Sequence, residues 1–299
     1  FTRSGPSVKG AIKPDVVAYG GNWAYNGRSG TLTTKAGLGE LSKHKDALAT
    51  GIMLGEESGT SFSAPHVAHI AAKIHGKPET GNRDLVRALI AANARIPDET
   101  RQAFSNHADA LSVAGYGMVD ERGLFDSMED EVTLISTSSI ENSKHHFYEV
   151  PVPEDFIAGG ARTRELSVAL AHTPYVRSTR IDYKATRVEF RLVDAGSLEE
   201  IVEIFNRETE RNRYDQIKEV GSELGSSNRE ISRKKKKKGT LQASTWRFQR
   251  MTVRSPLRNN RLFLVVTRND FSWGEPHCAV EEDYALVISF KDRENEHAN

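Results

Sequence analysis

The sequence has very little cysteine, no long apolar run and no excess of charge of either sign. Cys278 is the only cysteine, which excludes an intramolecular disulfide and favours a reducing, cytoplasmic compartment. No stretch of about eighteen uninterrupted apolar residues occurs, so we expect no membrane span. The 41 basic residues balance 41 acidic ones, so no global field favours a nucleic acid as partner.

The most informative stretch is Gly59-Thr60-Ser61-Phe62-Ser63-Ala64-Pro65-His66-Val67-Ala68, in which a turn of small residues leads into a predicted helix. A serine there lies beside unpaired N–H groups and the positive end of the helix dipole. The Ser61 N–H can therefore stabilise the oxyanion that forms next to the attacking oxygen. Pro65 fits this arrangement, since the first turn of a helix tolerates a missing N–H. The pattern predicts a nucleophile at Ser61; an ordinary N-cap serine is the alternative.

This stretch resembles the active-site serine motif of the subtilisin-like serine peptidases (subtilases). Two flanking stretches agree with it: Phe1–Pro6 with Ile12–Ala18 resembles the strand before that serine, and Gly115–Asp120 resembles the segment after its helices. The nucleophile elbow of α/β-hydrolases does not fit, because it needs glycine two residues after the serine, where Ser63 stands. The resemblance implies an α/β fold over residues 1–129, part of a doubly wound parallel sheet. It also implies Ser61 as nucleophile and Gly59 and Thr60 as oxyanion and substrate-binding residues.

The partners that activate such a serine are missing from the sequence. A serine hydroxyl needs a positioned histidine as base and a carboxylate that orients the histidine. In the family, that aspartate, that histidine with its His-Gly-Thr signature and the oxyanion asparagine all precede the segment with which this chain opens. Neither Asp-Ser-Gly, Asp-Thr-Gly nor His-Gly-Thr occurs. We therefore expect the C-terminal part of a longer peptidase, inactive on its own.

The histidines that are present predict neither a base nor a metal site. His66 and His69 share a helix face that runs away from Ser61, which favours packing over catalysis or zinc binding. The others stand in no catalytic string and are interpreted as surface or core residues: His44, His75, His107, His145, His146, His172 and His277. The sequence indicates no cofactor and leaves structural calcium sites undetermined.

Hydrophobic periodicity gives a coarse map of the first 129 residues. Residues 12–18 predict a short buried strand, and residues 22–58 a long loop that either shapes a substrate cleft or is a plain insertion. A second helix begins at Asn82. Its apolar face is predicted to pack on the Ser61 helix and is formed by Leu85, Val86, Leu89 and Ile90. A short element closes this region over residues 118–128.

Residues 130–299 have a different composition and predict an all-β sandwich or jelly-roll-like domain. The predicted strands cover residues 165–171, 187–193, 245–248, 262–266 and 284–290. A helical, lysine-rich insertion near 197–239 interrupts them. Its run Lys234–Lys238 could bind nucleic acid or an anionic membrane surface, but a solvated loop is favoured because no aromatic residues interleave the lysines.

The sequence as a whole predicts a serine endopeptidase that acts on protein or peptide substrates through an acyl-enzyme on Ser61. An inactive pseudopeptidase whose β domain binds a partner protein is the alternative. A third interpretation makes the β domain a stabiliser or lid of its own catalytic unit.

Overall fold

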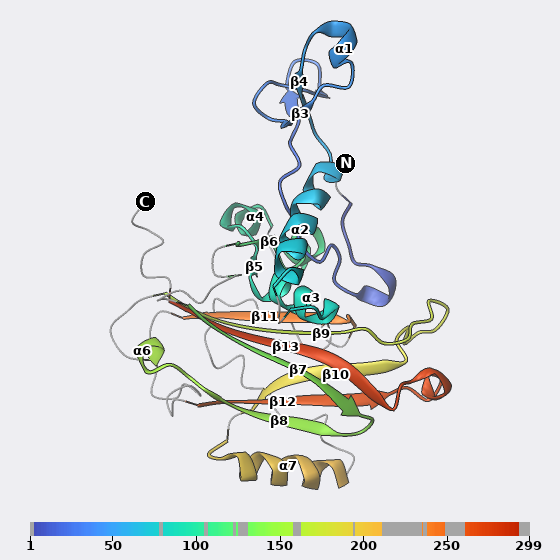
Figure 1. Ribbon diagram of the computed structural model, residues 1–299, viewed down its shortest axis with the longest axis vertical. Coiled ribbons are helices and arrows are strands. Elements are labelled where there is room, and N and C mark those ends of the chain that lie inside the picture. Colours follow the sequence, from blue (N-terminus) through green and yellow to red (C-terminus); the bar gives the residue numbers. More distant parts are fainter. Residues whose placement is uncertain are drawn as a thin grey trace.

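The computed structural model describes residues 3–77, 80–104, 107–121, 124, 131–157, 163–193, 195–210, 235, 238–248 and 261–292. These residues form helices and several antiparallel sheets, so the chain has a mixed α/β content. Figure 1 shows an extended arm at the top, a layer of helices below it, and two larger sheets below the helices. The serine motif lies in the upper part, between the arm and the helix layer.

Residues 22–58 form the arm, which consists of two β-hairpins, so the prediction of a loop there is wrong. Its elements are β1 (Ala24–Asn26), β2 (Thr31–Thr33), β3 (Glu40–Lys43), α1 (Ala47–Thr50) and β4 (Leu54–Glu57), preceded by the short helix η1 (Val8–Gly10). β1 pairs with β2 and β3 with β4, both antiparallel. The Asn26 side chain accepts the Arg28 N–H at 3.0 Å and closes the first turn. The strands are three or four residues long and mostly exposed, which hides them from hydrophobic periodicity.

The predicted strand at residues 12–18 is wrong: only Val17 pairs, through a single parallel bridge to Met118. Every sheet in the described part of the chain is antiparallel, so those residues do not form the expected doubly wound parallel sheet. Neighbouring parallel strands must be joined by long crossover connections. Within the described residues, parallel pairing is limited to the single bridge between Val17 and Met118. Ile12, Val16 and Val17 still pack against the buried core.

The helix layer contains the predicted pair of helices. Its elements are α2 (Thr60–His75), α3 (Arg83–Ala92), β5 (Ala94–Arg95), α4 (Asp98–Ala103), α5 (His107–Ala114) and β6 (Met118–Val119). Asn82 caps α3 by accepting the N–H groups of Asp84 and Leu85 at 2.8 and 3.3 Å. The predicted packing of α3 on α2 is confirmed. Of the element predicted over residues 118–128, Met118 and Val119 form β6 and Leu124 is buried, whereas residues 122–123 and 125–130 lie outside the described residues.

Two antiparallel sheets account for most of residues 131–292. Their strands are β7 (Glu131–Glu141), β8 (His145–Pro151), β9 (Arg164–His172), β10 (Thr186–Val193), β11 (Leu241–Phe248), β12 (Arg261–Asp270) and β13 (Glu281–Asp292). The sheet orders are β11-β9-β13-β7 and β10-β12-β8. All five predicted strands are confirmed. The sequence did not predict β7 and β8, because serine, threonine and histidine residues interrupt the alternation of apolar and polar side chains in these strands.

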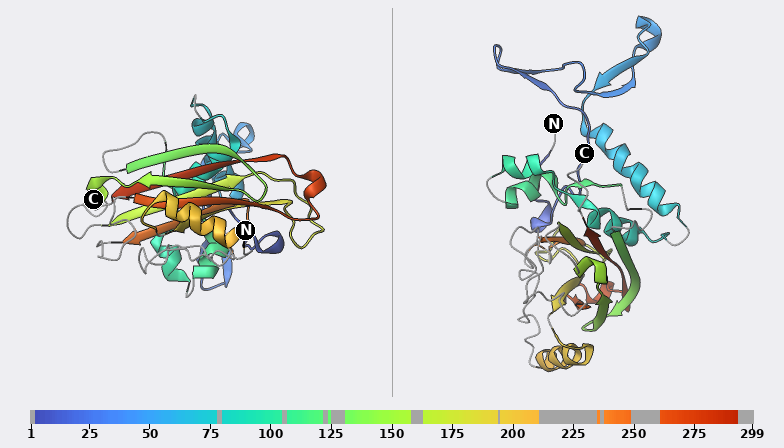
Figure 2. Two further views of the ribbon diagram at one scale, coloured as in Figure 1. Left: turned by 90° about the horizontal axis from the view of Figure 1, so that it is seen from below. Right: turned by 90° about the vertical axis from the view of Figure 1, so that its left-hand side faces the viewer.

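The two sheets share a buried cluster that includes Leu166, Val168 and Leu170 of β9 with Phe190 and Leu264 of the other sheet. The two views in Figure 2 show the sheets as adjacent layers. The opposite face of the four-stranded sheet contributes to a second cluster with the helix layer. β9 is therefore covered on both sides.

The predicted helix after residue 197 is α7 (Leu198–Glu210), which covers the outer face of the three-stranded sheet (Figure 1). Ile201 and Phe205 pack there against Phe263 and Val265. Most of the remaining insertion lies outside the described residues, including all of the lysine run except Lys235 and Lys238. Two further short helices are α6 (Glu154–Ile157) and η5 (Glu275–His277).

Candidate active site

Ser61 lies at the start of α2, as the sequence predicts, and its side chain is exposed. Gly59 is the N-cap residue and Thr60 the first helical residue, so Ser61 occupies the second position. The N–H groups of the first helical turn have no carbonyl four residues earlier within the helix, and the positive end of the dipole lies there. A negative charge that develops beside Ser61 Oγ is therefore favoured.

Pro65 lies deeper in the helix than predicted. Because α2 begins at Thr60, Pro65 is beyond the first turn and inside the helix. A proline at this position cannot donate to the carbonyl four residues earlier, which belongs to Ser61. The first turn of α2 is therefore held by fewer helix hydrogen bonds than an ordinary first turn, and Ser61 depends on contacts from outside the helix.

A contact of this kind comes from the segment around Gly20. The Gly59 N–H donates to the Gly20 carbonyl at 2.7 Å, immediately before the helix begins. The two backbones approach so closely that a Cβ at Gly20 would lie 2.6 Å from the Gly59 carbonyl oxygen and 2.3 Å from Ser63 Oγ. Glycine at position 20 therefore fixes where the Ser61 turn lies.

The two flanking stretches lie side by side. The Val17 N–H donates to the Gly117 carbonyl at 2.9 Å, and the Tyr116 N–H donates to the Asp15 carbonyl at 2.8 Å. Gly117 has φ +112°, and a Cβ there would lie 2.0 Å from the Arg95 carbonyl carbon. These contacts hold the segment before the serine against the segment after its helices.

No described histidine acts on Ser61 in this structure. Within the described residues, the Ser61 hydroxyl forms no hydrogen bond, and no histidine is paired with it. His66 Nε2 lies 3.8 Å from Glu40 Oε2 of the arm, and His44 Nδ1 accepts the Asp46 N–H at 3.2 Å. Within the described residues, Ser61 therefore has no hydrogen-bonded proton acceptor of the kind that a serine nucleophile needs.

The arm beside Ser61 exposes an unusual amount of apolar surface. Its exposed large side chains are Tyr19, Trp23, Tyr25, Leu32, Leu38, Leu41, Leu48, Ile52, Met53 and Leu54. Soluble monomers seldom expose many large apolar side chains over one segment unless the surface has a partner. Figure 2 shows the two hairpins standing away from the helices and sheets.

Two other properties of the described residues bear on the site. Among them, no group of three or more histidine, cysteine, aspartate or glutamate side chains is arranged to hold a metal ion. Within the same ranges, no helix has the length and apolar character needed to cross a membrane.

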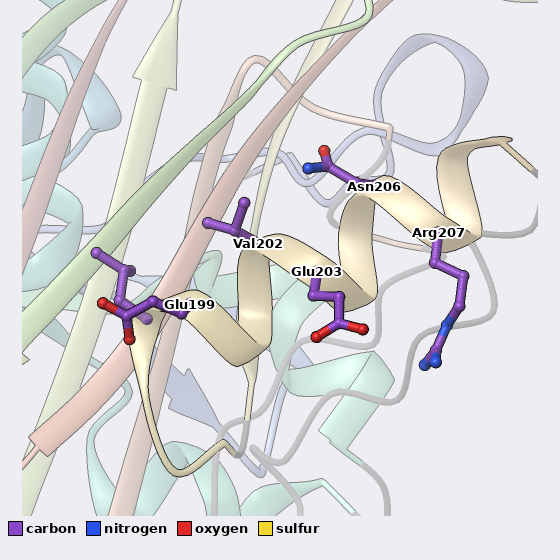
Figure 3. A pocket seen from close by; sticks show the side chains of 6 residues that line it. Glu199, Val202, Glu203, Asn206 and Arg207 are labelled. Carbon is purple, nitrogen blue, oxygen red and sulfur yellow. The ribbon is translucent and has the colours of Figure 1, made fainter.

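One surface hollow lies far from the serine. A hollow of about 550 Å³ runs along one face of α7 and is lined by Leu198, Glu199, Val202, Glu203, Asn206 and Arg207. Figure 3 shows these side chains projecting from consecutive turns of the helix. α7 lies on the far side of both sheets from α2 (Figure 1), so this hollow is not part of the candidate active site.

Comparison with known proteins agrees with the serine motif. Residues 1–119 match the sequence profile described as "Subtilase family". A relative from Sinorhizobium fredii (strain NBRC 101917 / NGR234), named "Uncharacterized protein y4bN", is 35% identical over an alignment of 202 residues, and the match covers 64% of this chain and 45% of the relative. The chain thus spans less than half the length of that relative.

One similar solved structure adds no argument about the fold. It is titled "Crystal Structure of the STIV MCP" and aligns at 12% identity with a TM-score of 0.17, over 52% of this chain and 48% of that one. The sequence profile covers the exposed serine, its glycine contacts and both flanking stretches. The segment of residues 1–119 is therefore similar to the subtilase family.

Proposed function

We propose that the protein is a serine endopeptidase in which Ser61 attacks the peptide carbonyl. The observation that carries this proposal is the exposed Ser61 at the start of α2, within the region that matches the subtilase profile. The histidine, the aspartate and the oxyanion asparagine come from polypeptide outside these 299 residues. Protein or peptide chains are the substrate class, and the reaction needs no cofactor.

The proposed reaction has two halves. Ser61 Oγ loses its proton to the histidine and bonds to the carbonyl carbon, and the leaving amine then takes that proton as the peptide bond breaks. The Ser61 N–H and the asparagine hold the oxyanion, and the Thr60 side chain supports the same site. Gly59 leaves room for the substrate backbone. Water then attacks the acyl-enzyme, with the histidine again as base, and releases Ser61.

The apolar arm supports the part of the proposal that involves further polypeptide. Exposed aromatic and aliphatic side chains next to Ser61 are suited to packing against a second segment. We propose that this segment is the one that carries the histidine. Packing against that segment explains both the apolar surface of the arm and its position beside Ser61.

We also propose two units along the chain, with residues 1–129 as the C-terminal part of a subtilase catalytic domain and residues 130–299 as a β-sandwich. The buried cluster between the two sheets supports the second unit. Two packed antiparallel sheets of four and three strands are the arrangement expected of such a sandwich.

The test is peptide hydrolysis by the longer protein that contains this chain. Ser61→Ala should abolish turnover while the melting temperature stays unchanged, because the side chain is exposed and forms no hydrogen bond among the described residues. Ser63→Ala, two residues further along α2, is the matched control and should retain turnover. Normal turnover by Ser61→Ala would refute the proposal.

An inactive pseudopeptidase is the second candidate, and the unpartnered Ser61 hydroxyl is the observation that favours it. The sequence upstream of Phe1 separates the two candidates. Asp-Ser-Gly or Asp-Thr-Gly together with His-Gly-Thr there supports a peptidase, whereas their absence supports a protein-binding role for the β region.

A further inference from the structure

Helix α3 lies on the outer face of the four-stranded sheet, and alanines of both elements contribute to the buried contact, beside the larger Leu241 and Val287 of the sheet. The buried residues of α3 at this contact include Ala88, Ala91 and Ala92. The sheet contributes alanines from three neighbouring strands: Ala169 and Ala171 of β9, Ala243 of β11 and Ala285 of β13. Side chains without bulk on both surfaces let a helix approach a sheet closely, where dispersion contacts are numerous.

Arg87 joins the N-terminal half of α3 to the sheet. Its Nη1 donates to Asp84 Oδ1 at 2.9 Å and to the His172 carbonyl at 3.2 Å, and its Nη2 donates to Thr240 Oγ1 at 2.9 Å. Thr173 Oγ1 in turn donates to Asp84 Oδ1 at 2.7 Å. A planar guanidinium can satisfy acceptors on two strands at once, whereas a lysine ammonium acts as a single point charge.

The C-terminal end of α3 is held by a second set of polar contacts. Asn93, the C-cap residue, accepts Lys291 Nζ on its Oδ1 at 2.6 Å, and the same ammonium lies 2.7 Å from Glu131 Oε1. All three side chains are buried. Nearby, the buried Tyr116 hydroxyl donates to the Leu241 carbonyl at 2.8 Å. The helix is thus fixed to the sheet at both ends as well as along its middle.

The contact extends to the helix that carries the nucleophile. Ile70 and Ile74 of α2 are buried in the same cluster as Leu85 and Leu89 of α3. The rest of α2 is largely exposed, and Pro65 removes a hydrogen bond from its first turns. α3 is therefore the main packed support of α2 in the described structure, and α3 itself lies on the sheet.

We infer that the outer face formed by β11, β9 and β13 supports the helix pair α2 and α3, and we call this supporting surface the floor. Arg87 is a positioning residue that acts on Ser61 through α3 and α2. The role in catalysis rests on the proposed peptidase function, whereas the role as floor does not. The C-terminal sheets are then a second unit that supports the catalytic one, and they do not act only as a recognition module. Catalytic geometry tolerates little displacement of a nucleophile, so loss of the floor lowers turnover more than substrate binding.

The first test uses hydrogen exchange on the 299-residue chain and needs no activity. Arg87→Met should speed exchange at the Ile70 and Ile74 amides by about tenfold, because α2 loses part of its support. Arg83→Met is the matched control: Arg83 lies one turn earlier on the same helix, is exposed, and should leave those amides unchanged. Equal exchange rates of the Ile70 and Ile74 amides in the two variants would overturn the inference that the sheet supports α2.

Two further variants keep this test decisive if Arg87→Met does not fold. Thr240→Val removes the Nη2 acceptor without changing the shape of the side chain, and should give the same effect at a smaller size. Ala171→Leu places bulk between sheet and helix at a position that is fully buried, and should lift α3 and speed α2 exchange. If the α2 amides of both variants exchanged at the wild-type rate, the inference that the sheet supports α2 would also be overturned.

The second test measures kcat and KM in the longer, active protein. Arg87→Met should lower kcat about tenfold with KM within about twofold of wild type, and Arg87→Lys should restore part of kcat. A change in KM alone, or equal kcat for Arg87→Met and Arg83→Met, would overturn the positioning role. If the wild-type protein itself does not turn over, the proposed function fails, and the exchange result still decides the floor.

Discussion

Gly20→Ala is the most informative single substitution near Ser61, because it adds only one methyl group. The new Cβ would lie 2.6 Å from the Gly59 carbonyl oxygen and 2.3 Å from Ser63 Oγ. The serine hydroxyl can rotate away, but the Gly59 carbonyl is backbone. The backbone must therefore move by roughly 0.5–1 Å to restore ordinary contact, and the movement lies two residues before the nucleophile.

A shift of that size has two expected effects. Overpacking of this kind costs about 1–3 kcal/mol, so the melting temperature of the 299-residue chain should fall. A displacement of about 1 Å at a nucleophile can cost 10²-fold in rate, so kcat of the longer protein should fall by up to that factor.

Gly27→Ala is the control for this substitution, because a Cβ there meets nothing within 4 Å. Thermal melts of the chain and peptide hydrolysis by the longer protein are the assays. If Gly20→Ala matches Gly27→Ala in both, the close approach does not hold Ser61, and our reasoning about this turn is wrong.

Three further substitutions test the supports of the site. Gly117→Ala combines a left-handed φ of +112° with a Cβ 2.0 Å from Arg95, so we expect a loss of more than about 3 kcal/mol; a native melting temperature would contradict this. Asn82→Ala removes the α3 cap and should cost about 1 kcal/mol in urea unfolding, and an unchanged midpoint would show that the cap contributes nothing. Burial raises the pKa of the Glu282 carboxyl from 4.5 to about 7. Its contribution to stability is therefore complete below about pH 4.5 and is lost as the pH rises through 7. The loss is up to about 2 kcal/mol, because solvent in the surface hollow that Glu282 lines together with Arg83 and Thr173 screens part of the effect. Urea titrations at pH 5 and pH 8 should show that Glu282→Gln reduces this fall, whereas the exposed Glu281→Gln preserves it; the same fall in both variants would exclude Glu282 as its source.

Local signals in the sequence predicted the serine helix, the capped second helix and five of the seven strands in the two larger sheets. Ser61 and Asn82 lie at helix starts, where residue type and spacing agree with backbone chemistry over a few residues. The same locality explains the failures. Pro65 appeared to belong to a first turn because the sequence did not fix where α2 begins, and the arm hairpins carry too few buried residues to show a period of two.

The floor beneath α3 was the hardest feature to foresee, although its signal is visible in β9. Large side chains at Leu166, Val168 and Leu170 alternate with small ones at Ala169 and Ala171. The large side chains fill the space between the sheets, and the small ones lie under the helix. The alternation predicts a strand and which face is bulky, but it does not name the helix, about eighty residues earlier in the chain, that covers the other face.

The Arg87 contacts could not be predicted from the sequence for the same reason. Its acceptors lie on His172, Thr173 and Thr240, which are brought together only by the sheet. A charged residue on a predicted amphipathic helix is normally assigned to the solvent face.

The most direct test of the central claim is to locate the adduct that a fluorophosphonate forms with the protein. The longer protein that contains this chain should carry one adduct, on the Ser61 peptide, when digests are mapped by mass spectrometry. The 299-residue chain alone should stay unlabelled, because the described residues provide no base to Ser61. An adduct on a different serine of the longer protein, or efficient labelling of Ser61 in the isolated chain, would contradict the account.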